Sequence, residues 1–309
     1  MTSTAFEWTG RHDGDGYEHA RWHSVVRADL DTDHDVELIG FASDEGVRRN
    51  EGRIGAAEGP VAIRSALANL SAPGVRVADR GDVTVKGEDL ESGQSELASW
   101  IAASIDRKAM PIVLGGGHET AWGSYQGIRQ SKAFGRGKLG IINLDAHFDL
   151  RQADRPTSGS PFSQIAEAEA ARNQPFSYTV LGISEPNNSF ALFARTQELG
   201  VSYVLDEDCT PETLPDLLRY LDSFMSQVDH VYLTVDLDVL PASDAPGVSA
   251  PAALGVAPRV ILEIVKHLAD AGKLCLVDVV ELNPRFDIDS RTAKFAARLV
   301  HEVARREAD

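Results

Sequence analysis

Short runs of apolar residues alternate along the chain with amphipathic segments. The apolar runs predict buried strands at 36–42, 110–116, 139–145, 178–184, 201–205, 230–238 and 273–282. The segments between them, rich in Ala and Leu at helical spacing, predict helices over 60–71, 91–106, 118–130, 163–172, 212–226, 257–271 and 291–306. Strands that are apolar on both faces and alternate with helices are typical of a parallel sheet covered by helices. The pattern therefore predicts an α/β fold.

The domain organisation follows from the continuity of this pattern. No internal repeat, low-complexity tract or long linker interrupts it, so we expect a single domain over 35–309. The stretch 1–34 is polar and rich in Gly, His and Asp, and we expect it to form an irregular N-terminal extension.

The net charge, the cysteine count and the lack of long apolar runs exclude several classes of protein. The net charge is −17, from 30 Lys and Arg against 47 Asp and Glu, which argues against nucleic-acid binding and against docking on anionic membranes. With only Cys209 and Cys275, a reducing compartment is a simpler interpretation than a disulfide framework. The N-terminus has no apolar signal region, and no apolar run reaches membrane-spanning length. We therefore expect a cytoplasmic enzyme or binding protein.

Ionisable side chains follow four of the predicted strands. In open parallel sheets, functional groups gather at the carboxyl ends of the strands. The four segments are Gly115-Gly116-Gly117-His118-Glu119, Asp145-Ala146-His147-Phe148-Asp149, Asp236-Leu237-Asp238 and Glu281-Leu282-Asn283-Pro284.

The spacing within two of these segments indicates metal binding. Side chains of extended chain alternate between faces, so Asp145, His147 and Asp149 are expected to project together, as are Asp236 and Asp238. Neighbouring buried aspartates repel each other and lose solvation, and a bound cation offsets both costs. Aspartates and histidines together suit Mn²⁺ or a similar divalent ion, and so many ligands suit two ions that share carboxylates.

Taken singly, each motif has an ordinary explanation. An Asp-x-Asp pair is more often a helix cap or a solvated loop, and a glycine-rich loop is often a flexible turn. The segment 115–119 also lacks the Lys-Ser/Thr of a phosphate-binding P-loop. The four motifs together, each ending an apolar run, predict a binuclear metal centre.

At these motifs the sequence resembles the ureohydrolase family of arginases, agmatinases and formimidoylglutamases. The segments "GGGHE", "NLDAHFD", "TVDLDVLPASDAPGVSAPAALGV" and "VVELNP" match its signature regions, and the similarity spans about residues 35 to 305. The resemblance implies a three-layer α/β/α arginase-like sandwich around a mostly parallel eight-stranded sheet, which makes 35–309 an arginase-like catalytic domain. It also implies two Mn²⁺ per subunit, one held by His118, Asp145, Asp149 and Asp236 and the other by Asp145, His147, Asp236 and Asp238.

Within the family, the formimidoylglutamase branch is the most similar. Residues 44–67 resemble it, as do Arg151 and the segment 158–164. Arginases carry after the Asp-x-His-x-Asp motif a histidine often assigned to proton shuttling, and residues 150–164 contain none. The resemblance implies hydrolysis of N-formimidoyl-L-glutamate to L-glutamate and formamide in histidine degradation, by a homo-oligomer (trimer or hexamer). Glu281 would face the amidine group, and Asp149 is our candidate for relaying a proton to the leaving nitrogen.

A substrate with two carboxylates needs cationic anchors in so acidic a protein. Arg151 lies two residues past Asp149 and is the first candidate. The others that we name for substrate binding are Arg53, Ser158 and Asn188, although a surface ion pair or a helix N-cap would also explain residues of these types.

Several alternatives stay open. The nearest is another ureohydrolase that acts on a guanidino acid such as guanidinobutyrate, or on arginine or agmatine. Agmatine is disfavoured because it would require carboxylates in place of Arg151. The deacetylases of the same fold use one zinc ion and lack the full ligand set. A metal-binding regulatory relative without activity is the remaining alternative.

Overall fold

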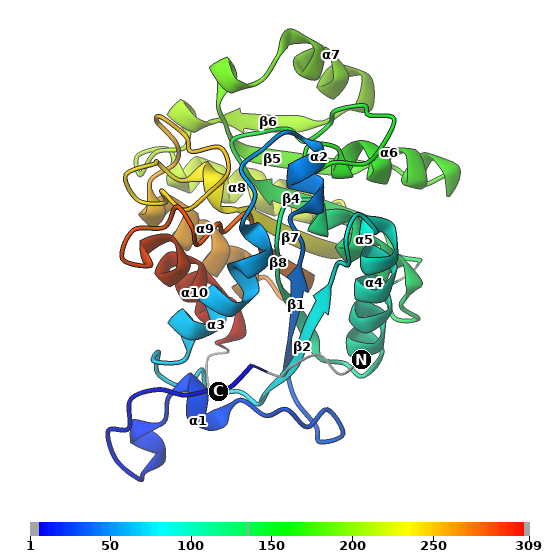
Figure 1. Ribbon diagram of the computed structural model, residues 1–309. Coiled ribbons are helices and arrows are strands. Elements are labelled where there is room, and N and C mark those ends of the chain that lie inside the picture. The colour runs from blue at the N-terminus through cyan, green and yellow to red at the C-terminus, as the bar shows by residue number, and fades with distance from the viewer. Residues whose placement is uncertain (1–5, 135, 306–309) are drawn as a thin grey trace.

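The centre of the protein is one parallel β-sheet. The computed structural model describes residues 6–134 and 136–305. Eight strands lie in the order β2-β1-β3-β8-β7-β4-β5-β6, and every pair of neighbours is parallel (Figure 1). In chain order the strands are β1 (Val36–Ala42), β2 (Val77–Thr84), β3 (Met110–Leu114), β4 (Leu139–Leu144), β5 (Ser177–Ile183), β6 (Ser202–Leu205), β7 (His230–Asp236) and β8 (Leu274–Val280).

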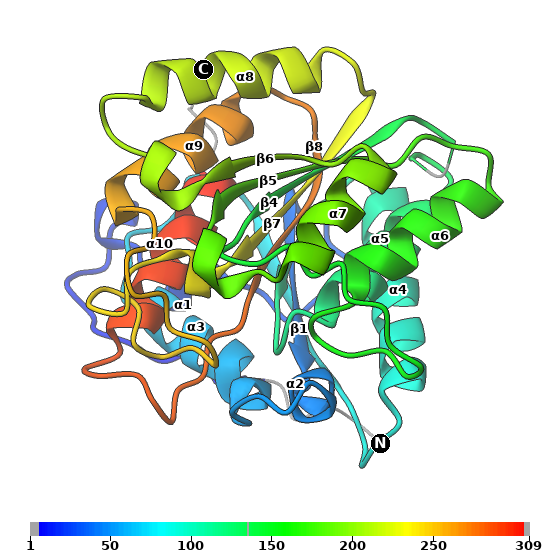
Figure 2. The same cartoon turned by 90° about the horizontal axis from the view of Figure 1, so that it is seen from above.

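Helices cover both faces of this sheet (Figure 2). One apolar core lies under α4 (Leu90–Asp106), α5 (Thr120–Gln130), α6 (Pro161–Ala171) and α7 (Phe190–Leu199). The other lies under α3 (Gly59–Leu67), α8 (Leu214–Met225), α9 (Pro258–Asp270) and α10 (Arg291–Ala304). Two short helices, α1 (Trp22–Val25) and α2 (Glu45–Arg49), lie near the ends of β1. The predicted three-layer α/β/α class is thereby confirmed.

All seven strands and seven helices predicted from the pattern occur, with shifts of a few residues at their ends. The pattern missed β2, because three charged residues interrupt its sequence VADRGDVT and leave no continuous apolar run. Charged residues are typical of edge strands, and β2 is one edge of the sheet. The pattern also missed α7, in which Thr196 is the one buried residue and the first residue, Phe190, is exposed.

The N-terminal stretch holds two helical turns, Tyr17–His19 and α1. Trp22 of α1 is completely buried, packs in the same core as α3 and α10, and donates from its indole nitrogen to His301 Nδ1 (3.0 Å). The described part of the extension, from residue 6 onward, is thus anchored to the domain.

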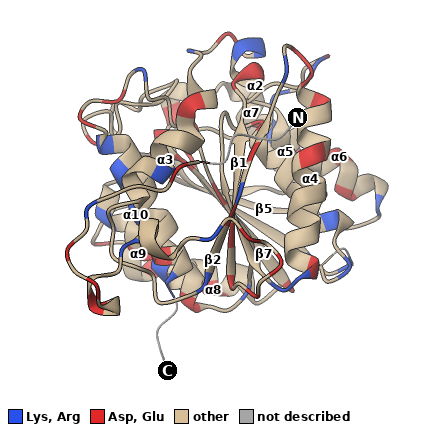
Figure 3. Cartoon of the chain, turned by 60° about the horizontal axis from the view of Figure 1, so that its bottom comes forward, with Lys and Arg blue, Asp and Glu red and all other residues tan. Residues whose placement is uncertain are grey.

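The charged residues lie mainly on the outer helices and loops (Figure 3). In the described part of the chain, no helix is both long and apolar enough to cross a membrane.

The edge strand is fixed by a buried arginine. Arg64 of α3 is 0% exposed and donates to Asp79 on β2 through Nε (2.9 Å) and Nη2 (2.8 Å), and to Asp82 through Nη1. Trp8 donates to the same Asp79 carboxylate (2.8 Å). The guanidinium therefore joins α3, the edge strand and the N-terminal stretch.

Replacing Arg64 by Met should destabilise the fold, because Asp79 and Asp82 would lose the cation that compensates them. Breaking a buried ion pair on one side costs about 3–5 kcal/mol, measurable as a lower free energy of unfolding in urea. Arg76→Met is the matched control, since it removes an exposed arginine that pairs with Asp35, and it should change stability little. Equal losses in the two variants would contradict this role of Arg64.

Candidate metal centre and active site

Four neighbouring strands end at the same level of the sheet. Within the order β3-β8-β7-β4, Leu114 pairs with Val279, Val280 with Asp236, and Val235 with Leu144. The segments that follow these strands therefore lie close together at this edge of the sheet. This register brings together the four motifs that are far apart in the sequence.

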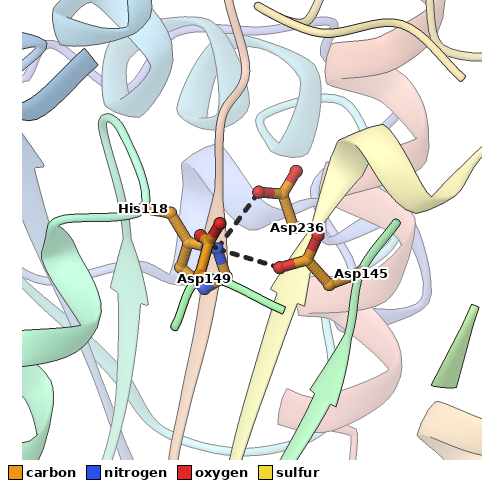
Figure 4. A group of neighbouring side chains, drawn as sticks. All are labelled: His118, Asp145, Asp149 and Asp236. Atoms are coloured by element: carbon orange, nitrogen blue, oxygen red, sulfur yellow. Dashed lines mark ion pairs between the residues drawn. The ribbon is translucent and has the colours of Figure 1, made fainter. Parts of the chain in front are cut away.

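The first ligand cluster surrounds one ring nitrogen of His118 (Figure 4). His118 Nδ1 lies 3.2 Å from Asp145 Oδ2, 3.0 Å from Asp149 Oδ2 and 3.1 Å from Asp236 Oδ2. This nitrogen is buried and has no hydrogen-bond partner among the described residues. Three carboxylates around an imidazole nitrogen are a ligand set that suits a divalent cation.

The second cluster shares Asp145 with the first. Asp145, His147 and Asp238 have ligand atoms within 4.8 Å of one another. His147 Nδ1 lies 3.0 Å from Asp238 Oδ2 and 3.6 Å from Asp145 Oδ1. Asp145 thus offers a different oxygen to each cluster, as a bridging ligand does. Asp236, the other predicted bridge, accepts from the Asp238 backbone N–H through its second oxygen (2.8 Å), so its bridging stays a prediction.

The electrostatics of the clusters favour bound cations. Burial, together with the neighbouring aspartates, raises the pKa of Asp236 far above its ordinary value, and burial also raises the pKa of Asp149 and Asp238. Burial opposes the ionisation of Asp145 too, but its close contacts with the imidazoles of His118 and His147 outweigh burial and lower its pKa. Four such carboxylates and two imidazoles fit two divalent ions, because only added positive charge relieves their repulsion.

The backbone that carries these ligands differs from the extended chain that the sequence predicted. Strand β4 ends at Leu144, and Asp149 has a left-handed backbone with φ of 49°. Strand β7 ends at Asp236, and Asp238 lies in a 3₁₀ turn. The side chains converge as expected. The predicted cause, the alternation of side chains along an extended strand, is wrong, because most of these residues follow the ends of the strands. A left-handed aspartate is a strained conformation of the kind that clusters at functional sites.

Asn188 secures the backbone of the Asp145–Asp149 segment. Its amide nitrogen donates to the Ala146 carbonyl (2.9 Å) and the Ser184 carbonyl (2.9 Å), and its oxygen accepts from the Phe148 N–H (3.2 Å). Asn188 lines the cavity, but its amide group is already hydrogen-bonded to the backbone of the metal-binding segment, so its contact with a substrate stays a prediction. A helix N-cap was the alternative for Asn188, but the residue at that position of α7 is Ser189.

Glu281 lines the cavity beside the first cluster. It is 5% exposed, has a left-handed φ of 67°, and its Oε1 accepts from the His118 backbone N–H (2.8 Å). Burial, followed by the nearby charge of Glu119, raises the pKa of Glu281 to about 8. A cationic group that enters the cavity would therefore favour the ionised form of the Glu281 carboxyl group.

The cavity also exposes polar groups that no metal-binding segment uses. It is lined by Asn50, Gly52, His147, Asp149, Arg151, Ser158, Asn187, Asn188, Leu192, Asp236, Asp238, Ser249, Ala250 and Glu281. The Arg151 side chain is exposed and forms no ion pair within the described ranges, while its N–H donates to the Gly159 carbonyl (3.0 Å). Ser158 is buried and its N–H donates to the Gly46 carbonyl (3.1 Å).

The other arginines near the cavity are engaged elsewhere. Arg53 donates to the backbone carbonyls of Val248 and Ser249 and lies over the Phe286 ring, 4.1 Å from its centroid. Arg48 and Arg49 both pair with Glu45. Arg53 thus holds the loop that presents Ser249 to the cavity, and its direct contact with a substrate stays a prediction.

Several lining residues had no assigned role in the sequence interpretation, among them Leu192, Ser249 and Asn50. Leu192 belongs to α7, which the pattern missed, so no signal pointed to it. Ser249 lies inside the long motif after Asp238, and Asn50 lies beside the arginines of 44–67. Their positions in those motifs were the available signal, but only folding shows that their side chains reach the cavity.

Comparison with known proteins agrees with this geometry. The model of the Arginase family matches residues 34–305. A formimidoylglutamase of Ralstonia nicotianae is 52% identical over 304 residues (96% of this chain, 94% of the relative), and one of Aeromonas hydrophila is 51% identical over 302 residues (96% of each). The crystal structure of an arginase from Bacillus subtilis has a TM-score of 0.77 at 27% identity, covering 88% of this chain and 99% of that one.

The fold likeness extends to a second solved structure. The formimidoylglutamase from Bacillus subtilis has a TM-score of 0.83 at 23% identity, covering 96% of this chain and 95% of that one. With the family match over nearly the whole domain and the ligand clusters at its central strand ends, this chain belongs to the arginase family.

Proposed function

We propose that this protein is a formimidoylglutamase, which hydrolyses N-formimidoyl-L-glutamate to L-glutamate and formamide. Relatives with that name share about half of its residues over nearly full length. The observation that carries the proposal is one cavity lined by ligand-cluster residues, by Glu281 and by Arg151, which has no ion-pair partner among the described residues. This arrangement suits a substrate that is cationic at its reacting end and anionic at the other.

We propose two Mn²⁺ ions as the cofactor. His118, Asp145, Asp149 and Asp236 would hold one, and Asp145, His147, Asp236 and Asp238 the other. When bound, such ions supply Lewis acidity, which lowers the pKa of water toward neutrality. Oxygen and imidazole ligands without thiolate suit Mn²⁺.

Glu281 binds and orients the amidinium group in this proposal. Its Oε1 is held by the His118 N–H, which fixes the carboxylate against the metal-binding loop. The formimidoyl group is positively charged near neutral pH, so it forms a charge-assisted hydrogen bond with Glu281 in a site shielded from water. The carbon is thereby placed for attack by water.

Asp149 transfers a proton from water to the leaving nitrogen in this proposal. Its carboxylate is 13% exposed and lines the cavity, so it faces both the ligand cluster and the substrate. Water adds its oxygen to the formimidoyl carbon, and the bond between that carbon and the glutamate nitrogen breaks. Asp149 accepts the proton that water loses and delivers it to the leaving nitrogen, which completes L-glutamate and formamide.

Arg151 and Ser158 recognise the glutamate end. The Arg151 guanidinium is exposed at the cavity wall, and its planar donors match a carboxylate in two-pronged geometry. Ser158 lies on the same loop and adds a short polar contact. We also expect a cytoplasmic homo-oligomer, a trimer or hexamer, that acts in histidine degradation.

A substrate panel tests the proposed function. Formimidoylglutamate, guanidinobutyrate, arginine and agmatine are compared as kcat/KM values at saturating Mn²⁺, with release of each product measured. We expect formimidoylglutamate to exceed the others by orders of magnitude. A higher value for guanidinobutyrate would assign the protein to guanidino acids, and no hydrolysis of any of them would favour the regulatory alternative.

Asp145→Asn should remove activity and reduce bound Mn²⁺ to less than one ion per chain, because Asp145 faces both clusters. Metal content is measured by elemental analysis after gel filtration. Asp206→Asn is the matched control, since Asp206 follows the edge strand β6 and belongs to neither cluster. Two full equivalents of Mn²⁺ in Asp145→Asn would contradict the bridging assignment.

Glu281→Gln should keep both metal ions and lose catalysis. Glutamine has nearly the same shape and its oxygen can still accept from the His118 N–H, but it offers no charge to the amidinium. The loss should be about 2–4 kcal/mol in the transition state, seen as a lower kcat/KM. An unchanged kcat/KM would place Glu281 outside the substrate contact.

Arg151→Lys should raise KM strongly despite the retained charge, because lysine cannot form the planar two-pronged pair. Arg151→Ala should be worse still, and metal content should be normal in both. Arg155→Lys is the matched control, because Arg155 lies on the same loop and pairs with the exposed Glu88. Wild-type kinetics in both Arg151 variants would show that Arg151 does not bind the substrate.

A further inference from the structure

A buried asparagine contacts the metal-binding segment without lining the cavity. Asn143 of β4 is 0% exposed and is not among the residues of the cavity wall. Its Nδ2 donates to Asp145 Oδ2 (2.8 Å) and to Tyr178 Oη (3.0 Å). The mechanism above makes no use of Asn143.

Packing alone does not explain an amide at this position. Asn143 Oδ1 is buried and has no hydrogen-bond partner among the described residues. A buried carbonyl oxygen without a partner destabilises the fold, and a leucine of similar size would fill the same space without that cost. The feature that leucine lacks is the NH2 group, and both of its protons are used. The donor function of Asn143 therefore explains the amide.

The directions of these hydrogen bonds are fixed by the groups themselves. An ionised carboxylate only accepts, so the amide must turn its NH2 group toward Asp145. Tyr178 Oη accepts the second proton and donates its own to the Phe148 carbonyl oxygen (3.1 Å), which also only accepts. The line from Asp145 through Asn143 and Tyr178 to Phe148 thus connects both ends of the metal-binding segment.

Each oxygen of the Asp145 carboxylate accepts one hydrogen bond and faces one ligand cluster. Oδ2 accepts from Asn143 and lies 3.2 Å from His118 Nδ1. Oδ1 accepts from the His147 backbone N–H (2.7 Å) and lies 3.6 Å from His147 Nδ1. A carboxylate oxygen has two lone-pair sites, so a second site on each oxygen stays available to its cluster. The two donors together fix the rotation of the carboxylate.

We propose that Asn143 is a positioning residue that holds the Asp145 carboxylate with one oxygen directed at each metal ion, while Tyr178 holds the Asn143 amide. Without the amide, the carboxylate is free to rotate and to offer both oxygens to a single ion. Hydrogen-bond partners behind metal ligands typically change metal affinity about 10–100-fold. This inference rests on the proposed binuclear centre.

Metal titration of the apoprotein tests the role of Asn143 without reference to activity. Free Mn²⁺ is measured by its electron paramagnetic resonance signal, which gives two dissociation constants for the wild type. Asn143→Leu keeps the volume and removes the donor. We expect at least one dissociation constant to rise about 10–100-fold, and both sites to fill again at high Mn²⁺. A variant with a collapsed site would stay empty at every concentration.

Tyr178→Phe tests the group that holds the amide. It removes one hydroxyl, so the Asn143 amide loses its second acceptor, and the same dissociation constant should rise by a smaller factor than in Asn143→Leu. Tyr232→Phe is the matched control, because Tyr232 is equally buried and its hydroxyl donates to Asp278 (2.5 Å), which belongs to neither cluster. Its Mn²⁺ constants should be those of the wild type.

The outcomes separate this inference from the metal centre on which it rests. Two bound ions with wild-type constants in Asn143→Leu would overturn the inference alone, as would equal weakening in Tyr178→Phe and Tyr232→Phe. A wild type that binds no Mn²⁺ would overturn the proposed centre and the inference with it. Metal-free thermal unfolding checks the folding of every variant. Should Asn143→Leu fail to fold, Tyr178→Phe decides in its place, and unchanged constants there would overturn the inference.

Discussion

The mutual repulsion of buried aspartates is the constraint on which this structure depends. Asp145, Asp149, Asp236 and Asp238 meet within a few ångströms at the ends of two neighbouring strands, and water reaches them little. Neither histidine can neutralise four carboxylates. Bound cations would offset this repulsion, so metal binding is expected to stabilise the site as well as to supply its chemistry.

The scaffold tolerates this cluster because a parallel sheet buries the strands and leaves only their ends to carry polar groups. The central four strands end in register, and large apolar cores on both faces hold them there. Conformational strain is confined to the loops, where Asp149 and Glu281 have left-handed backbones. Asn188 and the His118 N–H then fix the two strained segments through hydrogen bonds. Rigid strands and strained, well-bonded loops together aim the ligands inward.

Much of this was accessible from the sequence, for a physical reason. Buried strands of a parallel sheet are continuous apolar runs, so seven of them and the polar motifs at their ends could be recognised. The edge strand β2 could not, because its charged residues resemble a polar loop until Arg64 pairs with Asp79 and Asp82. The sequence also could not distinguish Arg151, which forms no ion pair with any residue that the structure describes, from Arg53, which binds a neighbouring loop. Such differences depend on side chains that meet only after folding.

Anomalous X-ray diffraction from crystals grown with Mn²⁺ can show whether two metal ions bind around Asp145. Data collected on both sides of the manganese absorption edge locate the ions independently of any assumed role. We expect two peaks, one against His118 and one against His147, with a different Asp145 oxygen directed at each. A single peak, or two peaks that do not share Asp145, would contradict this expectation.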